Sequence, residues 1–371
     1  MKAMGIVFSN IYDSTLGELT NVRTVASLPF GGRYRQIDFV LSAMSNSGIR
    51  NVGIITKYNY RSLMDHLGNC ADWDLNRKNE GVVFLPPFAN GNTGVYKGKL
   101  EALYSAVHFI NNPDYDLVVV CDSTVLCSID LRVAMDSHIR SGCDVTVIAN
   151  REPQKPQRTH PLILKTDRKG FVTEMMIDAC VRPGCKVGMG MFIFNRSSLV
   201  EALEETYSRG MVHLEKDYLQ KRFNEGTLKI NTCEFDGVVL RNEDVRTYFA
   251  NNMALLDPKV RAGLFKRDFP IYTKVRDEVP SYYGEGSVIS DCVVADGCTL
   301  YGRAEKSVIF RGVTLKKGAR VRSGIIMQGT TIGENADLEC VILDKNVTVT
   351  DGAVLKGTPE HPVIVQKGET V

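Results

Sequence analysis

The stretch Met4-Gly-Ile-Val-Phe-Ser-Asn-Ile-Tyr-Asp13, near the start of the chain, decides how the first half of the sequence is interpreted. Met4 to Phe8 form a short apolar run that is typical of a buried strand. In an α/β domain, the loop after the first strand lies over the carboxyl edge of the sheet, where ligands bind. A loop that cradles a triphosphate needs glycines and cations, whereas this loop offers Ser9, Asn10 and Asp13. We therefore expect the frame of a nucleotide site without its phosphate-binding chemistry.

Length, charge and cysteine content limit the class of protein. A chain of 371 residues exceeds what one core usually supports, so we expect two domains. Lysine and arginine number 45 against 43 acidic residues, and this balance predicts neither nucleic acid nor a membrane surface as partner. The ten cysteines form no C-x-x-C pair, which favours reduced thiols. Without a signal peptide or an apolar run of membrane length, we expect a cytoplasmic protein.

The first region, residues 1–257, alternates strand and helix patterns. Apolar, β-branched runs predict strands at 4–8, 53–56, 117–120, 145–148 and 191–194. Helical spacing predicts helices at 37–46, 99–110, 131–138 and 246–256, and a further one from Leu199. Asp130 and either Ser197 or Ser198 are expected as N-caps. This order predicts an α/β domain with a mostly parallel sheet that is covered by helices.

The pattern changes after this region. Residues 258–285 show no clear period and are interpreted as a linker. From Gly286 to Val371, similar tetrads return at intervals of about 16 to 22 residues. These tetrads are Ser287-Val-Ile-Ser, Ser307-Val-Ile-Phe, Gly324-Ile-Ile-Met, Cys340-Val-Ile-Leu and Pro362-Val-Ile-Val.

A period near 18, made of three short strands of about six residues each, predicts a parallel β-helix of hexapeptide repeats. An ordinary β-sandwich is the alternative, and the repeated tetrads favour the solenoid. The inward-pointing side chains are expected to be Val313, Leu315, Val321, Ile332, Leu338, Val347, Val349 and Val354.

Several motifs together carry a resemblance that covers nearly the whole chain. They are Leu19 to Ser42, which includes Phe30-Gly-Gly-Arg-Tyr-Arg-Gln-Ile-Asp38, then Asn46-Ser-Gly-Ile49, Tyr96-Lys-Gly-Lys-Leu-Glu-Ala102, Gly188-Met-Gly-Met-Phe-Ile-Phe-Asn195 and Glu215-Lys-Asp217. They resemble the ADP-glucose pyrophosphorylase (glucose-1-phosphate adenylyltransferase) family. That family joins a Rossmann-like, GT-A-like nucleotidyltransferase domain to a left-handed parallel β-helix, which agrees with the two patterns above.

The resemblance also implies where triphosphate would bind. The family's cradle is a Gly-Gly-x-Gly-x-Arg loop followed by Arg-Ala-Lys-Pro. Ser9 and Asn10 stand at the Gly-Gly, and Arg23 keeps the arginine of the second motif, while Val25 replaces its lysine. We expect no phosphate clamp. The degenerate substrate-binding set is Ser9, Asn10, Arg23, Val25, Tyr96 and Gly188.

The metal and sugar-phosphate positions are altered as well. Asp122 matches the family's first metal carboxylate, although it could instead only cap the next turn. Arg241 or Asn242 falls at the second carboxylate, with Glu243 and Asp244 displaced by a couple of residues. A guanidinium there opposes a divalent cation, since like charges at ~4 Å repel by roughly 4 kcal/mol at an intermediate dielectric.

The lysine that holds glucose 1-phosphate is matched by Asp178, whose carboxylate repels phosphate. The catalytic set is therefore vestigial: Asp122, Asp178, Arg241 and Asn242. We expect this chain to require no cofactor, with Mg²⁺ bound by a catalytic partner. The metal role of Asp122 stays open.

The resemblance points to the family's non-catalytic, regulatory GlgD-type subunits. The expected partners are a catalytic ADP-glucose pyrophosphorylase subunit in a heterotetramer, further copies of this chain, and a phosphorylated metabolite as effector near Arg33 and Arg35. The basic residues Lys57, Arg61, Lys97 and Lys99 are interpreted as solvated charges at the rim of the cleft. Two alternatives stay open: an active adenylyltransferase that uses Asp122 with Glu243 or Asp244, and a ligand-sensing or scaffold protein.

Overall fold

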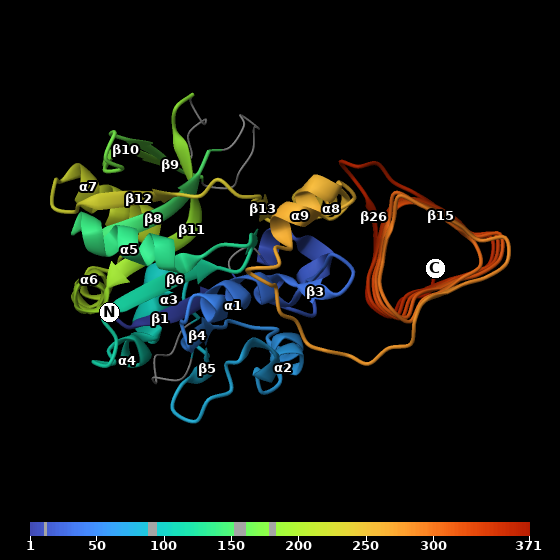
Figure 1. Ribbon diagram of the computed structural model, residues 1–371, viewed down its shortest axis with the longest axis horizontal. Helices are drawn as coiled ribbons and strands as arrows, with labels where there is room; N and C mark the ends of the chain where they lie inside the picture. The colour runs from blue at the N-terminus through green and yellow to red at the C-terminus, as the bar shows by residue number, and fades with distance from the viewer. Residues whose placement is uncertain (11–12, 88–94, 152–160, 178–182) are drawn as a thin grey trace.

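The computed structural model describes residues 1–10, 13–87, 95–151, 161–177 and 183–371. An α/β part and a triangular coil of strands lie against each other (Figure 1). The predicted site residue Asp178 lies outside the described residues.

A nine-stranded sheet forms the centre of the α/β part. Its main path has the order β10-β9-β11-β6-β1-β4-β5, and β8 joins β11 and β12. The strands are β1 (Ala3–Phe8), β4 (Asn51–Ile55), β5 (Gly81–Leu85), β6 (Leu117–Asp122), β8 (Val145–Asn150), β9 (Leu162–Thr166), β10 (Val172–Ile177), β11 (Lys186–Asn195) and β12 (Ile230–Glu234). Short pairs lie outside it: β2 (Pro29–Phe30) with β3 (Tyr34–Arg35), and β7 (Val125–Leu126) with β13 (Leu240–Arg241).

The strand directions confirm only part of the expected parallel sheet. β1 runs parallel to β4 and β6, with Val7 opposite both Ile54 and Cys121. The prediction was wrong for the strand that contains 191–194, because β11 is antiparallel to β6, β8 and β9. Parallel neighbours need a long crossover, usually a helix. No described helix lies between β8 and β11, and β9 and β10 form an antiparallel pair there.

Helices flank this sheet, and the last two lie between it and the coil of strands (Figure 1). They are α1 (Gln36–Asn46), α2 (Arg61–Leu67), α3 (Lys99–Ser105), α4 (Val107–Ile110), α5 (Leu131–Ser141), α6 (Arg196–Ser208), α7 (Lys221–Asn224), α8 (Val245–Ala254) and α9 (Pro258–Leu264). Asp130 caps α5 as expected, since its side chain accepts from the backbone N–H of Arg132 at 2.9 Å. The caps expected at Ser197 or Ser198 were wrong: both lie inside α6, whose extended N-cap residue is Asn195.

The expected linker contains regular structure. Its first residues form α9, which begins with Pro258 and is capped by the Asp257 carboxylate on the N–H of Lys259. Proline suits the first turn of a helix because no hydrogen-bond donor is needed there. Near its end, β14 (Tyr282–Tyr283) already pairs with the coil strand β17 (Thr299–Leu300). The exact domain boundaries stay a prediction.

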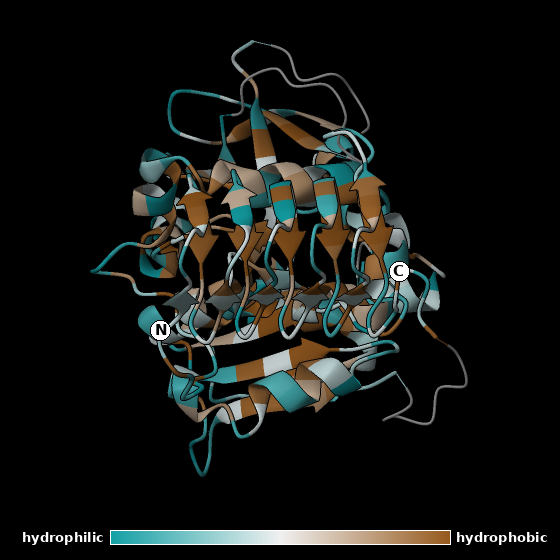
Figure 2. Cartoon of the chain, turned by 90° about the vertical axis from the view of Figure 1, so that its right-hand side faces the viewer, coloured by the Kyte–Doolittle hydropathy of each residue, from teal (hydrophilic) through white to brown (hydrophobic). Residues whose placement is uncertain are grey.

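The C-terminal part is a parallel β-helix. Its remaining strands are β15 (Val288–Ser290), β16 (Val293–Val294), β18 (Arg303–Glu305), β19 (Val308–Ile309), β20 (Thr314–Leu315), β21 (Arg320–Ile326), β22 (Thr331–Ile332), β23 (Asp337–Leu343), β24 (Thr348–Val349), β25 (Val354–Lys356) and β26 (Val363–Val365). Figure 2 shows the strands of successive coils stacked side by side. Like side chains form columns, such as Leu300, Leu315, Ile332 and Val349.

Two details of the predicted repeat were wrong. The tetrads at Ser287 and Ser307 are not equivalent, because Val288 pairs with Arg303 whereas Val308 pairs with Val293. The residue of the first coil that is equivalent to Val308 is therefore Val293, and Val288 belongs to a different column. The expected inward residues are buried, except that Val354 is 61% exposed. Val354 pairs with Asp337 on the outside, and Leu355 continues the column of Leu338. Neighbouring side chains of a strand point to opposite faces, so only one of the two can be inside.

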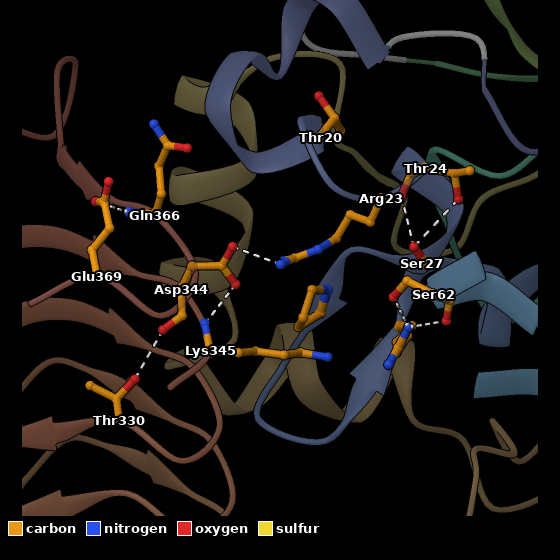
Figure 3. A network of polar contacts seen from close by, with 12 residues as sticks. Thr20, Arg23, Thr24, Ser27, Ser62, Thr330, Asp344, Lys345, Gln366 and Glu369 are labelled. Carbon is orange, nitrogen blue, oxygen red and sulfur yellow. Dashed lines mark hydrogen bonds and ion pairs between the residues drawn. The ribbon is translucent and has the colours of Figure 1, made fainter. Parts of the chain in front are cut away.

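The two parts share one hydrophobic core. The α/β part contributes Phe30, Phe39, Tyr248, Phe249, Leu255 and Leu264, among others, and the β-helix contributes Val308, Phe310, Ile325, Met327, Cys340 and Ile342. An ion pair joins the same two parts, with Arg23 Nη2 2.7 Å from Asp344 Oδ2 (Figure 3). Both side chains are almost inaccessible to solvent, at 2% and 3%. Asp344 also accepts from the backbone N–H of Lys345 at 2.6 Å.

This buried pair gives a first prediction. Replacing Asp344 by asparagine leaves the Arg23 guanidinium buried without its counter-charge. We expect Asp344→Asn to lower the free energy of unfolding by about 3–5 kcal/mol, as measured by urea denaturation. The double variant Arg23→Met/Asp344→Leu should recover much of this loss, because no charge is then left buried.

A matched control is Asp337→Asn, which breaks the solvent-exposed pair of Asp337 with Lys356 at 2.9 Å. Exposed pairs contribute little, so the unfolding curve should hardly move. Equal losses in Asp344→Asn and Asp337→Asn would contradict a special role for the buried pair.

Candidate functional site

A polar cleft lies at the carboxyl end of β6, where sequence analysis places the nucleotide site. We call it the sheet-edge cleft. Its charged lining residues are Lys99, Asp122, Glu215, Arg241 and Glu243, and Gly188, Gly190 and Phe192 complete much of the wall. It encloses about 430 Å³, part of which is open to solvent.

Asp122 is the central acid of the sheet-edge cleft. It is the last residue of β6 and is only 4% exposed. Its Oδ2 accepts from Lys99 Nζ at 3.0 Å, whereas its Oδ1 is buried without a hydrogen-bond partner among the described residues. Burial raises the pKa of Asp122 to about 6, Lys99 opposes the shift, and the carboxylates of Glu215 and Glu243 reinforce it.

Gly190 makes room for this carboxylate. Its backbone has φ +66°, and a Cβ atom there would lie 2.3 Å from Asp122 Oδ2. Glycine is the residue that adopts this backbone conformation without strain. Sequence analysis missed Gly190 as a site residue, although it lies within the quoted Gly188 motif.

The residues expected at the second metal position separate into different roles. Arg241 lines the cleft, where its Nη1 donates to Gly188 O and its Nη2 to Asn150 Oδ1, both at 2.8 Å. Asn242 is fully buried and accepts from Asn251 at 2.8 Å.

Of the two displaced acids, Glu243 lines the sheet-edge cleft. Asp244 instead caps α8, with its Oδ1 2.6 Å from the N–H of Thr247. The alternative that pairs Asp122 with Asp244 therefore loses its second carboxylate to the helix cap.

The cleft does not fit a magnesium ion. Mg²⁺ requires near-octahedral oxygen ligands at about 2.0–2.1 Å. Here Oδ2 of Asp122 and the carboxylate of Glu215 both accept from the same ammonium, that of Lys99. In the part of the chain that the structure describes, no group of three or more His, Cys, Asp or Glu side chains is arranged to hold a metal ion.

The described residues of the loop after β1 are hydrogen-bonded to neighbouring segments of the chain. Ser9 Oγ donates to Ile55 O at 2.8 Å, and Asn10 accepts from the N–H of Lys57 at 2.9 Å. Asp13 accepts from the N–H of Val25 at 2.8 Å, and burial raises its pKa. A triphosphate cradle works by offering free backbone N–H groups. The N–H groups of Lys57 and Val25 are already used by Asn10 and Asp13, and the loss of the phosphate clamp stays a prediction.

Three other predicted substrate residues lie away from the sheet-edge cleft. Arg23, which keeps the arginine of the family's second phosphate motif, points to Asp344 of the β-helix (Figure 3). Val25 is buried in the core shared by both parts. Tyr96 donates its hydroxyl to Thr56 O, and burial raises its pKa.

The interpretation of Lys99 as a solvated residue of the basic rim was wrong. The side chain of Lys99 is only 13% exposed and pairs with two carboxylates. Lys97, two residues earlier, is exposed as expected. Sequence spacing could not separate them, because the partner Glu215 is far away along the chain.

A second pocket lies where the α/β part meets the β-helix. We call it the basic pocket. Arg33 and Arg35, the predicted effector residues, line it together with Lys274, Arg276, Arg311 and Lys345. It encloses about 410 Å³, part of which is open to solvent. Sequence analysis found two of these six cations, because the others come from distant segments.

Positive charge is crowded around the basic pocket. Burial lowers the pKa of Arg35 to about 10, although its Nη1 still donates to Ser62 O and Ser62 Oγ. The pKa of Lys345 falls to about 6, chiefly through burial and then through Arg35, Arg23 and Arg276. A bound anion would relieve this repulsion, because opposite charge favours the protonated lysine.

Comparisons with known proteins agree with this architecture. A family model described as nucleotidyl transferase matches residues 14–236, and one described as GlmU-like, C-terminal hexapeptide matches residues 279–361. Fold and site thus define a nucleotidyltransferase-type α/β domain followed by a hexapeptide β-helix.

Similar proteins extend over almost the full chain. The glycogen biosynthesis protein GlgD of Bacillus subtilis strain 168 is 31% identical, and GlgD of Geobacillus stearothermophilus is 36% identical; both alignments cover 99% of this chain and 96% of the relative. A glucose-1-phosphate adenylyltransferase of Bacillus thuringiensis strain Al Hakam is 30% identical, over 98% and 96%. This chain belongs to the GlgD-type ADP-glucose pyrophosphorylase family and has a role in glycogen biosynthesis, which confirms the family that the motifs predicted.

The helices were also compared with the requirements of a membrane span. Among the described residues, no helix has both the length and the apolar character that crossing a bilayer demands.

The close approach of Gly190 to Asp122 gives a second prediction. Gly142 ends α5 with φ +59° and has nothing within 4 Å of its would-be Cβ, so it is a matched control. We expect Gly142→Ala to cost about 1–2 kcal/mol of unfolding free energy through backbone strain alone. Gly190→Ala should cost a further 1–3 kcal/mol or so, because its new methyl group overpacks the site.

Urea denaturation measures the unfolding free energy of both variants. Adding Asp122→Ala to Gly190→Ala should recover the second part of the loss, since the colliding carboxylate is then gone. Equal costs for the two alanine variants would show that the absence of a side chain at Gly190 is not what makes room for the Asp122 carboxylate.

Proposed function

We propose that this chain is a regulatory, catalytically deficient subunit of ADP-glucose pyrophosphorylase, which converts ATP and glucose 1-phosphate to ADP-glucose and diphosphate. Its partner is a catalytic subunit with an intact phosphate loop that binds Mg²⁺, and the two assemble as a heterotetramer. The observation that carries the proposal is the contact of Lys99 with Asp122 at 3.0 Å, which engages the retained carboxylate. The occupied N–H groups of Val25 and Lys57 support it.

The basic pocket supports a regulatory role. Its cations come from both parts of the chain: Arg33 and Arg35 from the α/β part, Arg311 and Lys345 from the β-helix. A phosphorylated metabolite would be held by guanidinium groups, which suit phosphate oxygens. Such a ligand would stabilise one arrangement of the two parts, and a subunit can pass that preference to its partner through their contacts.

One observation favours the active-enzyme alternative. Asp122 and Glu243 both line the sheet-edge cleft, so two carboxylates are present where the chemistry would occur. Against it stands the ammonium of Lys99 on Asp122. The scaffold alternative has no supporting contact of its own.

A reconstitution assay tests the proposed function. The purified chain alone should make ADP-glucose at a very low rate or not at all. Mixed with the catalytic subunit, it should change the velocity or the response to phosphorylated metabolites. A rate from the chain alone that is near that of ordinary family members would establish the active-enzyme alternative instead.

Three matched variants localise the effect. Arg33→Ser and Arg276→Ser remove cations of the basic pocket, and Arg140→Ser removes one from an exposed position on α5. Only the first two should weaken the metabolite response of the mixed enzyme. A failure of the chain to associate with any catalytic subunit would favour the scaffold alternative.

The shifted pKa of Lys345 gives a pH prediction. The free side chain, with a pKa of about 6, is neutral at pH 7–9, where a phosphomonoester stays dianionic. A bound dianion raises that pKa, so binding takes up a proton. Affinity should therefore fall as pH rises from 7 to 9, by up to about tenfold per unit.

Calorimetry with a hexose bisphosphate, in buffers of different ionisation enthalpy, measures both the affinity and the proton uptake. Lys345→Arg keeps its charge over this range, so its affinity should be nearly independent of pH. The exposed Lys356→Arg serves as control and should behave like the unmodified chain. A slope that persists in Lys345→Arg would assign the proton to another group.

A further inference from the structure

The position of Lys99 in the sheet-edge cleft is fixed by its surroundings. Gly98, just before it, has no room for a side chain, because a Cβ atom there would lie 2.4 Å from Val212 O. Leu100, just after it, donates its backbone N–H to the same Val212 carbonyl at 3.0 Å. The backbone at the start of α3 is thus fixed on both sides of Lys99. This fixed backbone limits the positions that the Lys99 ammonium can reach.

The Lys99 ammonium is surrounded by groups that stabilise a positive charge. Its Nζ lies 3.0 Å from Asp122 Oδ2 and also bonds the carboxylate of Glu215, which the π-helical segment Leu214–Gln220 carries. The rings of Phe8 and Phe192 stand 5.8 and 5.7 Å from Nζ, within the range of cation–π attraction. Two carboxylates and two aromatic rings around one mostly buried charge make a site for a monovalent cation.

We propose that the Lys99 ammonium is a resident counter-ion that takes the place of a divalent cation at Asp122, and that removing it opens a divalent-metal site there. Asp122 Oδ1 is buried without a hydrogen-bond partner among the described residues, so it is available to a metal once Oδ2 is released. The carboxylates of Glu215 and Glu243 line the same cleft; the described residues hold no preformed group of three metal ligands, so a divalent cation would have to draw these carboxylates toward Asp122. Hard divalent cations bind such oxygen sets.

Sequence analysis expected the Arg241 guanidinium to be the group that repels a metal ion. That guanidinium is tied to Gly188 O and Asn150. The group that contacts Asp122 is Lys99. The inference concerns the cleft alone and holds whether or not the chain regulates a partner.

The test measures Mn²⁺ binding to the full chain by the loss of the free-ion electron paramagnetic resonance signal. Unmodified protein and Lys97→Met should show no site that depends on Asp122. Lys97 is exposed, so this control removes a neighbouring charge without touching the cleft. Lys99→Met should gain one Mn²⁺ site that is at least about tenfold tighter than any in unmodified protein. The double variant Lys99→Met/Asp122→Asn should lose it.

Thermal unfolding gives a second readout. Lys99→Met brings uncompensated carboxylates together, so its melting temperature should fall in EDTA and recover when Mn²⁺ or Mg²⁺ is added. The melting temperature of unmodified protein should not change when EDTA, Mn²⁺ or Mg²⁺ is added. If Lys99→Met folds poorly in both conditions, Lys99→Gln, which retains a hydrogen-bond donor, replaces it in both measurements.

Two results would overturn the proposal. One is a stoichiometric Mn²⁺ site in unmodified protein that Asp122→Asn abolishes, because the ammonium then does not exclude the metal. The other is a folded Lys99 variant that gains neither Mn²⁺ binding nor divalent-dependent stability.

Discussion

The buried ion pair between Arg23 and Asp344 is the contact on which the arrangement of the two parts depends. It lies beside the apolar core that both parts build, and each partner belongs to a different part. A buried charge is tolerated only when its partner is correctly placed. The pair therefore favours one relative position of the α/β part and the β-helix. The basic pocket, whose wall combines Arg35 with Lys345, exists only in that position.

Much of the fold was predictable because hydrophobic periodicity is a local signal. The strand after Lys2 and the columns of the β-helix follow from runs of apolar residues. The direction of β11 was not predictable, because it depends on whether a helix crosses the sheet before it, and the hairpin of β9 and β10 had no strong pattern. Val354 was wrongly expected inside for a different reason, because a one-residue shift in register exchanges inside and outside.

The new contacts of the charged residues at the candidate site could not be predicted from the sequence. The missing glycines after Phe8 do predict, on chemical grounds, that a phosphate cradle is lost. The new partners of the remaining charges come from distant segments, so no spacing could show them. Arg23 pairs with Asp344 and Lys99 with Glu215, and both pairs depend on the tertiary fold. The sequence analysis placed Lys99 among solvated charges and gave no sign of the contact between Arg23 and the β-helix.

The two sites differ in how their charges are balanced. In the sheet-edge cleft, the acids Asp122 and Glu215 meet an ammonium of the chain itself, so the cleft is compensated from within. In the basic pocket, burial and then the neighbouring cations Arg35 and Arg23 lower the pKa of Lys345 to about 6. A site whose charges are neutralised by other residues of the chain is stabilised little by a bound ion. A site with excess charge is stabilised by an ion of opposite charge. The ligand chemistry of this chain is therefore expected where the two parts meet, and its charge should be negative.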